Sequence, residues 1–421
     1  MVRRPHRAAV LAVLGALVLV SGCSTGKATH ESTGSSHPKR AAATSPPSAM
    51  TAAPARLAVH PANGATDLSP AVPVTAVVSD GTITSAKLVS SSGRVLTGKV
   101  AADGASWKLG EKLGYGHSYT LRVDAKNADG HAVTRTSRFT TVTPGYFTLP
   151  YLEDTATASI VAGGTYGVGM VVNVQFDEPI TNKAAAEKAI TITSTPAVKG
   201  AFFWLNDQTV HWRPAHYWTP GTQVSVHANL YGVDVGNGLW GQQDVSTHFQ
   251  IGASHIAIAN AKTHQVKVYW NGTLKRTMPT SMGQGGCVPG VHGTRICLWT
   301  PPGTYTVMNK QRSVVMDSAS YGLPHSSPYG YKETIYWATR ISSDGIFLHE
   351  LMSTVWAQGH VNVSHGCVNL NHTNAYWYYH HSYVGDVVTV IHSGGEPLHA
   401  WQNGDWSVPW ETWVKGGVNA G

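Results

Sequence analysis

The residues best suited to chemistry lie in one short segment near the end of the chain, Val363 to Asn369. The segment reads Val-Ser-His-Gly-Cys-Val-Asn and places Cys367 directly after a glycine. A free cysteine has a pKa of about 8.5 and only the thiolate attacks, so a nearby imidazole must take or share the proton at neutral pH. We predict that Cys367 is a nucleophile and that His349, a short loop upstream, is its general base or ion-pair partner.

This pattern resembles the signature of the L,D-transpeptidases, cysteine enzymes that cross-link bacterial peptidoglycan. In that family a histidine precedes a Ser/Thr-His-Gly-Cys-x-Asn segment by a short loop. The likeness is to the mycobacterial type, which carries tandem immunoglobulin-like domains, and it covers roughly residues 55 to 416. Outside the motif it rests on these segments: 316–322, 330–331, 337–339, 357–360 and the tail around 404–410.

The resemblance implies a two-step acyl transfer on peptidoglycan stem peptides. The thiolate of Cys367 would attack the carbonyl at the L-centre of a diaminopimelate-type residue and expel the terminal D-alanine. A side-chain amine of a neighbouring stem would then take the thioester. No cofactor and no metal are expected, and β-lactams of the carbapenem class are expected to inhibit by acylating Cys367.

The resemblance and the residue types assign supporting roles around the thiol. By resemblance, His365 orients the first imidazole or tunes the thiol, and Tyr321 and Tyr331 belong to a substrate lid. Ser364 is predicted to hydrogen-bond a histidine, and Asn369 to hold the loop or contact substrate.

The glycine beside the sulfur has a role of its own. Gly366 leaves room for a substrate backbone to approach the thiol. Backbone N–H groups of residues 365–367 are predicted to stabilise the oxyanion of a tetrahedral intermediate. One departure from the family is visible, in the segment 350–356 after the first histidine, and it concerns the shape of the acyl-donor pocket.

Three other interpretations stay open at this point. An L,D-carboxypeptidase or related cysteine peptidase would use the same thiol but let water resolve the thioester. A wall-binding adhesin without enzymatic activity would use neither the thiol nor the water molecule. Zinc accepts histidine and thiolate ligands, but the spacing of His349, His360, His365 and Cys367 matches no finger or zincin pattern.

The start of the chain predicts secretion and a lipid anchor. Arginines at positions 3, 4 and 7 precede an apolar run over 8–20, too short for a comfortable membrane span. The run ends in Val-Ser-Gly-Cys23, which resembles a bacterial lipobox. We expect a lipoprotein signal peptide over 1–22, lipidation of Cys23, and a disordered tether over 23–54. These place the enzyme at the extracytoplasmic face of the cell membrane, anchored and reaching into the wall.

Two further cysteines and the net charge agree with that compartment. Cys287 and Cys297 lie ten positions apart, and outside the cell a local disulfide is the natural prediction. The formal charge of +7 favours an acidic environment such as wall polymers or anionic lipid head groups. No basic run is interleaved with aromatic residues, so no nucleic acid is expected as a partner.

The middle of the chain contains a repeat that predicts two immunoglobulin-like sandwiches, over 55–145 and 146–252. Short strands alternate with turn residues, and four positions recur at a constant offset of 105 residues. The recurring pairs are Trp107 and Trp212, Gly116 and Gly221, Leu121 and Val226, and Val123 and Ala228. The fold class is therefore predicted to be mainly β.

The catalytic domain is predicted over 253–393, β-rich with one or two helices. Alternation over 265–270, the Asn271-Gly272 turn and a return strand over 273–280 predict a type I′ hairpin. A strand over 345–351 is expected to carry His349. A short C-terminal subdomain over 394–421 holds four tryptophans that are expected to pack the tail onto a domain: Trp401, Trp406, Trp410 and Trp413.

Overall fold

The computed structural model describes residues 51–417, which fold mainly into β-strands. The predicted signal peptide, Cys23 and almost all of the predicted tether lie outside the described residues. Within the described part of the chain, no helix combines the length and apolar character needed to cross a bilayer.

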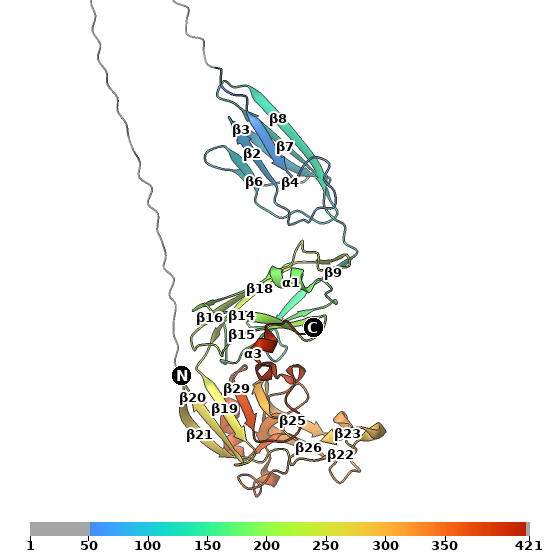
Figure 1. Ribbon diagram of the computed structural model, residues 1–421, viewed down its shortest axis with the longest axis vertical. Helices are drawn as coiled ribbons and strands as arrows, with labels where there is room; N and C mark the ends of the chain where they lie inside the picture. The colour runs from blue at the N-terminus through green and yellow to red at the C-terminus, as the bar shows by residue number, and fades with distance from the viewer. Residues whose placement is uncertain (1–50, 418–421) are drawn as a thin grey trace, which may run out of the picture. The chain divides into compact units, whose positions relative to one another are not determined.

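The first β-sandwich consists of two antiparallel four-stranded sheets (Figure 1). One sheet has the order β1 (Arg56–His60), β2 (Thr75–Ser79), β6 (Ser106–Leu109), β5 (Gly98–Val100). The other has the order β4 (Val95–Leu96), β3 (Thr82–Ser90), β7 (Ser118–Lys126), β8 (Ala132–Thr140).

The second β-sandwich also has two four-stranded sheets, with one added helix and one parallel pair of strands. One sheet has the order β10 (Pro150–Glu153), β12 (Val172–Phe176), β15 (Thr209–Pro214), β14 (Gly200–Trp204). The other has the order β11 (Gly164–Tyr166), β18 (Asp244–Ile251), β16 (Gln223–Asn229), β13 (Ile190–Thr195), and β11 with β18 is the parallel pair. Helix α1 (Lys183–Ala189) is capped by Asn182, and β9 (Tyr146–Thr148) pairs with β17 (Leu239–Gly241).

The sequence repeat has a packing cause in both sandwiches. Trp107 lies against Gly98 of the neighbouring strand, where a Cβ would be only 2.1 Å from the indole ring. Trp212 lies in the same way against Gly200, with a corresponding distance of 2.0 Å. Each tryptophan therefore needs a glycine on the neighbouring strand, two residues from the residue opposite it, and the predicted mainly β fold with immunoglobulin-like domains is confirmed.

The catalytic domain contains two sheets around a shared apolar core. The larger has the order β21 (Thr273–Pro279), β20 (Gln265–Trp270), β19 (His255–Asn260), β29 (Val387–Ile391), β24 (Gly303–Thr306). The first four of these strands are labelled in Figure 1. The smaller has the order β25 (Lys310–Asp317), β26 (Lys332–Arg340), β27 (Phe347–Glu350), β28 (Val368–Leu370). A separate hairpin joins β22 (Cys287–Pro289) and β23 (Arg295–Cys297), and α2 (His372–His381) follows β28.

Local sequence accounts for much of this arrangement. Val266 and Val268 point into the core, and the predicted turn follows with positive φ angles of 46° at Asn271 and 79° at Gly272. Both angles belong to a type I′ turn, so that prediction is confirmed. The strand carrying His349 is shorter than predicted, because it begins at Phe347, after Gly345 with a φ of 101°.

The tail packs mainly onto the second sandwich, through an arginine that the sequence did not single out. The guanidinium of buried Arg213 lies 4.6, 5.3 and 4.4 Å from the rings of Trp406, Trp410 and Trp413, the last two of which are in helix α3 (Trp410–Trp413). Trp401 departs from the prediction, because it is 59% exposed and lines the active-site cleft instead.

Candidate active site

Two neighbouring parallel strands, β27 and β28, position the predicted nucleophile and base. Leu348 pairs with Val368 and His349 with Asn369, so Cys367 enters β28 beside the strand that carries the imidazole. Adjacent strands lie about 4.8 Å apart. Phe347 and His349 share one face of β27, and Phe347 packs against Cys367. The structure thus brings the two predicted catalytic side chains to one face and one cleft.

The thiol of Cys367 rests in a mostly apolar environment. Its neighbours are Ile335, Ala338 and Phe347, and its sulfur lies 3.7 Å from the carbonyl oxygen of Gly345. Burial raises the pKa of Cys367 to about 12, although a backbone hydrogen bond with Phe347 acts in the opposite direction. The resting thiol therefore keeps its proton at neutral pH.

The imidazole of His349 is buried and is held in one tautomer. Its Nδ1 lies 2.9 Å from the carbonyl oxygen of Glu350, which can only accept, so Nδ1 carries the proton and Nε2 has a free lone pair. Burial lowers the pKa of His349 to about 4, with the hydrogen bond to Glu350 acting in the opposite direction. A neutral imidazole and a neutral thiol in one cleft favour the general-base alternative for His349 over the preformed ion pair.

The turn before Cys367 is held by Ser364 and by Thr300. Ser364 Oγ donates to the carbonyl of Cys367 at 2.6 Å and accepts from the N–H of Gly366 at 3.1 Å. Thr300 Oγ1 donates to the carbonyl of Gly366 at 2.7 Å and accepts from the N–H of Gly283 at 3.0 Å. The sequence does not predict Thr300 as a site residue, because only the folded chain places it next to Gly366.

These bonds correct two of the sequence predictions. Ser364 bonds the backbone of its own turn and not a histidine, since a short side chain satisfies the nearest backbone groups first. The N–H of Gly366 is consequently occupied and does not contribute to the oxyanion site. Gly366 has a φ of 149°, which favours glycine, and a Cβ there would approach the carbonyl oxygen of Trp299 to 3.2 Å.

Asn369 holds the loop after His349 and also lines the cleft, so both predicted roles remain compatible with its position. It is 1% exposed, and its Nδ2 donates to Thr354 Oγ1 at 3.4 Å. Thr354 lies in the segment after His349 that departs from the resembled family. The exposed side chains of that segment include Met352 and Trp356.

The predicted lid tyrosines cover the site together with His365. Tyr321 ends a 3₁₀ turn (Ser318–Tyr321), its ring lies 6.4 Å from that of Tyr331, and the Tyr331 ring lies 4.8 Å from the imidazole of His365. Burial raises the pKa of both tyrosines, and the nearby Cys367 thiolate would raise it further. His365 thus contacts the lid, and its buried Nε2 has no hydrogen-bond partner among the described residues.

Cys367, His349, His365 and the two lid tyrosines line one cleft of about 1210 Å³. That volume exceeds the common range of roughly 300–1,000 Å³ for small-molecule sites, so an extended substrate fits. Within residues 51–417, no three His, Cys, Asp or Glu side chains gather as ligands for a metal ion.

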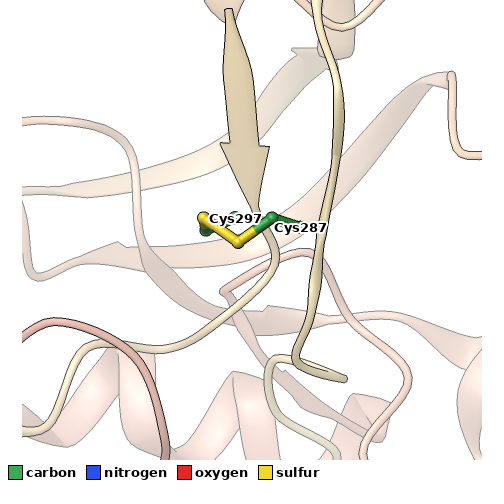
Figure 2. The surroundings of a disulfide bond; sticks show 2 residues. All are labelled: Cys287 and Cys297. Atoms are coloured by element: carbon green, nitrogen blue, oxygen red, sulfur yellow. A yellow bond between two sulfur atoms is a disulfide. The ribbon is translucent and has the colours of Figure 1, made fainter.

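The disulfide-closed hairpin β22–β23 forms one wall of the cleft. Cys287 and Cys297 are bonded and face each other across the two strands (Figure 2). At the tip of the hairpin, the N–H of Val291 donates to the carbonyl of Gly322 at 2.8 Å. Gly322 directly follows Tyr321, so the hairpin supports the lid.

Comparison with known proteins agrees with this geometry. A family model described as the L,D-transpeptidase catalytic domain matches residues 254–390, and one described as a bacterial Ig domain matches residues 65–234. L,D-transpeptidase 2 of Mycobacterium tuberculosis (strain CDC 1551 / Oshkosh) is 40% identical over 366 residues, which is 87% of this chain and 85% of the relative. The chain belongs to the L,D-transpeptidase family.

A second curated relative shows the same relationship. L,D-transpeptidase 5 of Mycobacterium tuberculosis (strain ATCC 25618 / H37Rv) is 35% identical over 368 residues, covering 86% of this chain and 76% of the relative. A solved structure of the L,D-transpeptidase LdtMt1 in complex with imipenem is 34% identical, with a TM-score of 0.47 over 57% of this chain and 99% of that chain.

Removing the hairpin disulfide of this L,D-transpeptidase is expected to destabilise the lid. The Cys287→Ser/Cys297→Ser double variant should lose about 3 kcal/mol of unfolding free energy, because an open loop gains conformational entropy in the unfolded chain. Thermal melts with and without reductant measure this. Reductant should lower the melting temperature of the native protein and leave the double variant unchanged; equal melting of all four samples would contradict the prediction.

Proposed function

We propose that this L,D-transpeptidase joins peptidoglycan stem peptides through a thioester on Cys367. The observation that carries the proposal is the pairing of a neutral thiol with a neutral, tautomer-fixed imidazole in one cleft. The substrate is a tetrapeptide stem whose diaminopimelate-type residue presents the attacked carbonyl.

The two neutral groups support a defined proton path. Nε2 of His349 takes the proton of Cys367 as the sulfur attacks the carbonyl carbon, and returns it to the nitrogen of D-alanine as that bond breaks. The acceptor amine then attacks the thioester, and His349 passes one amine proton to the departing sulfur. Backbone N–H groups other than that of Gly366 would hold the oxyanion.

Transfer is favoured over hydrolysis by the size of the cleft and by the family. A site that only released D-alanine would need room for one stem and a water molecule. The cleft is larger than a single small-ligand site and opens between the lid and the tail residue Trp401. We keep the L,D-carboxypeptidase as the second candidate, with the same thiol and water as the acceptor.

The proposed place of action is the outer face of the cell membrane. The lipobox ending at Cys23 would attach the chain to lipid, the tether would span roughly 30 Å as a coil, and the two sandwiches would act as a stalk. We also propose that carbapenems inhibit by acylating Cys367, since a strained β-lactam carbonyl offers the thiolate the same kind of target.

A donor and acceptor assay tests the proposed activity. A tetrapeptide stem incubated with the protein and a second stem carrying a free side-chain amine should give a cross-linked dimer and free D-alanine, separated by mass spectrometry. Cleaved monomer without any dimer would replace the transferase with the carboxypeptidase. An unchanged tetrapeptide would overturn both.

A further inference from the structure

One carboxylate in the cleft has no role in the thiol chemistry and no partner. Glu333 lines the cleft and is half-buried, and among the described residues its side chain makes no hydrogen bond or ion pair. A buried charge without a partner is costly, so a protein rarely retains one unless something binds to it.

The strand register places Glu333 beside the nucleophile. Glu333 and Ile335 are two residues apart on β26 and share one face of the sheet. Ile335 belongs to the apolar cluster that packs against Cys367, as does Met316, the residue directly opposite Glu333 on β25. The carboxylate therefore lies on the thiol side of the sheet, about two residues along the strand from the contact with the sulfur.

The other charged groups of the cleft are engaged or solvent-exposed. Asp344 accepts from Ser342 Oγ and from Gln402 Nε2, and Arg340 donates to the carbonyls of two serines. Asp317 is paired with Lys332 and with His325, on the lid. Glu396 and Arg295 are exposed.

Burial is the only influence on the titration of Glu333, and it raises the pKa of this carboxyl above its ordinary value. A neighbouring cation would lower that pKa instead. The site is thus prepared for a positive charge that arrives with a substrate.

We propose that Glu333 binds the protonated side-chain amine of the acceptor stem and directs it toward the Cys367 thioester. The inference rests on the proposed transferase function, because a hydrolase has no amine to bind. It adds the acceptor side of the site to the donor side formed by Cys367 and His349.

The proton balance gives such a group a task. An acceptor that enters as an ammonium must lose two protons to become an amide. The first passes to the Glu333 carboxylate and then to water, which leaves a neutral amine. Its nitrogen forms the bond to the carbonyl carbon, the carbon–sulfur bond breaks, and His349 carries the second proton to the sulfur.

Kinetics with separate donor and acceptor test the proposal. The donor is a tetrapeptide stem with an acetylated side-chain amine, which cannot accept. The acceptor is a tripeptide stem, which cannot donate. In Glu333→Gln the acceptor KM should rise about tenfold, which corresponds to ~1.4 kcal/mol of lost attraction, while the donor KM stays unchanged.

Three controls isolate the charge at this position. Glu396→Gln removes an exposed carboxylate from the same cleft and should leave the acceptor KM unchanged. Glu333→Asp keeps the charge and should recover part of the affinity. Hydroxylamine, which is uncharged at neutral pH, should react equally well with the native acyl-enzyme and that of Glu333→Gln.

The outcomes separate this inference from the proposed function. Native protein that cleaves the donor but never joins it to the tripeptide refutes the transferase. Native protein that cross-links, with an unaltered acceptor KM in Glu333→Gln, refutes only the role of Glu333. In Glu333→Gln, a higher KM for a donor with a free amine and an unchanged KM for the acceptor would also overturn the assignment. Glu333 would then bind the amine of the donor stem. Mass spectrometry of the donor acyl-enzyme serves as the folding control, because a variant that forms it is folded.

Discussion

Replacing Cys367 with serine is expected to reduce acyl transfer more than ~10⁴-fold. A serine hydroxyl is far harder to ionise than a thiol, and the imidazole that would help it has a pKa of only about 4 because His349 is buried. The apolar surroundings of residue 367 add to the cost of an alkoxide. The measurement is the rate of cross-link formation under single-turnover conditions.

Intact-mass measurement after exposure to a carbapenem supplies the matching chemical readout. The native protein should gain one drug mass, and Cys367→Ala should gain none. Cys287→Ser/Cys297→Ser is the matched control, because it removes two other cysteines of the same domain and should still be acylated. One drug mass on Cys367→Ala would show that the nucleophile lies elsewhere.

Replacing His349 with glutamine is expected to slow acylation by about 10²–10⁴-fold, the usual contribution of a positioned general base. Glutamine can still accept a hydrogen bond, but it cannot take up the thiol proton. The pKa of Cys367, raised to about 12, then controls the reaction. The rate of the variant should keep rising with pH through the neutral and alkaline range, because only hydroxide can generate its thiolate.

The native enzyme should show a different pH profile. His349 is neutral at any pH above about 4, so the acid limb of the acylation rate should lie well below the 6.5 of an ordinary histidine. An acid limb near pH 6.5 in the native protein would contradict the neutral resting pair. His372→Gln is a suitable control, since that histidine is exposed and bonded to Glu350 outside the cleft.

The burial of His349 also makes the folded protein less stable as the pH falls. Between about pH 6.5 and 4 the unfolded chain binds a proton at residue 349 and the folded chain does not, so unfolding is favoured as the pH falls through this window. The contribution is at most ~3 kcal/mol. Glutamine does not titrate, so His349→Gln should lose less stability than the native protein between those two pH values, as measured by denaturant titration.

Local patterns in the sequence predicted the elements that depend on local physics. The positive φ angles of Asn271 and Gly272 follow from residue type, and the repeated tryptophans mark the two sandwiches because each packs against a glycine of the neighbouring strand. The bond between Cys287 and Cys297 follows from their spacing within one hairpin. The long motif around Cys367 predicted the family, and its proposed nucleophile and base lie in one cleft.

The roles of the neighbouring residues depended on contacts between distant segments. Ser364 looked like a partner for histidine, but its nearest groups are the backbone of its own turn. Trp401 looked like packing for the tail, yet its side chain lines the cleft. No local sequence pattern marks Thr300 or Glu333, because their roles depend on residues that are distant in the sequence and close in the folded protein.

The sequence by itself therefore determined which atoms can react, since the reactivity of a thiol and an imidazole depends on residue type. Only the tertiary structure decided the protonation of the pair. The pKa values of Cys367 and His349 move in opposite directions because the packing of β26, β27 and β28 removes water from both groups. Tertiary packing likewise left Glu333 half-buried without a counter-charge, because the cations near it are held by other partners or face solvent.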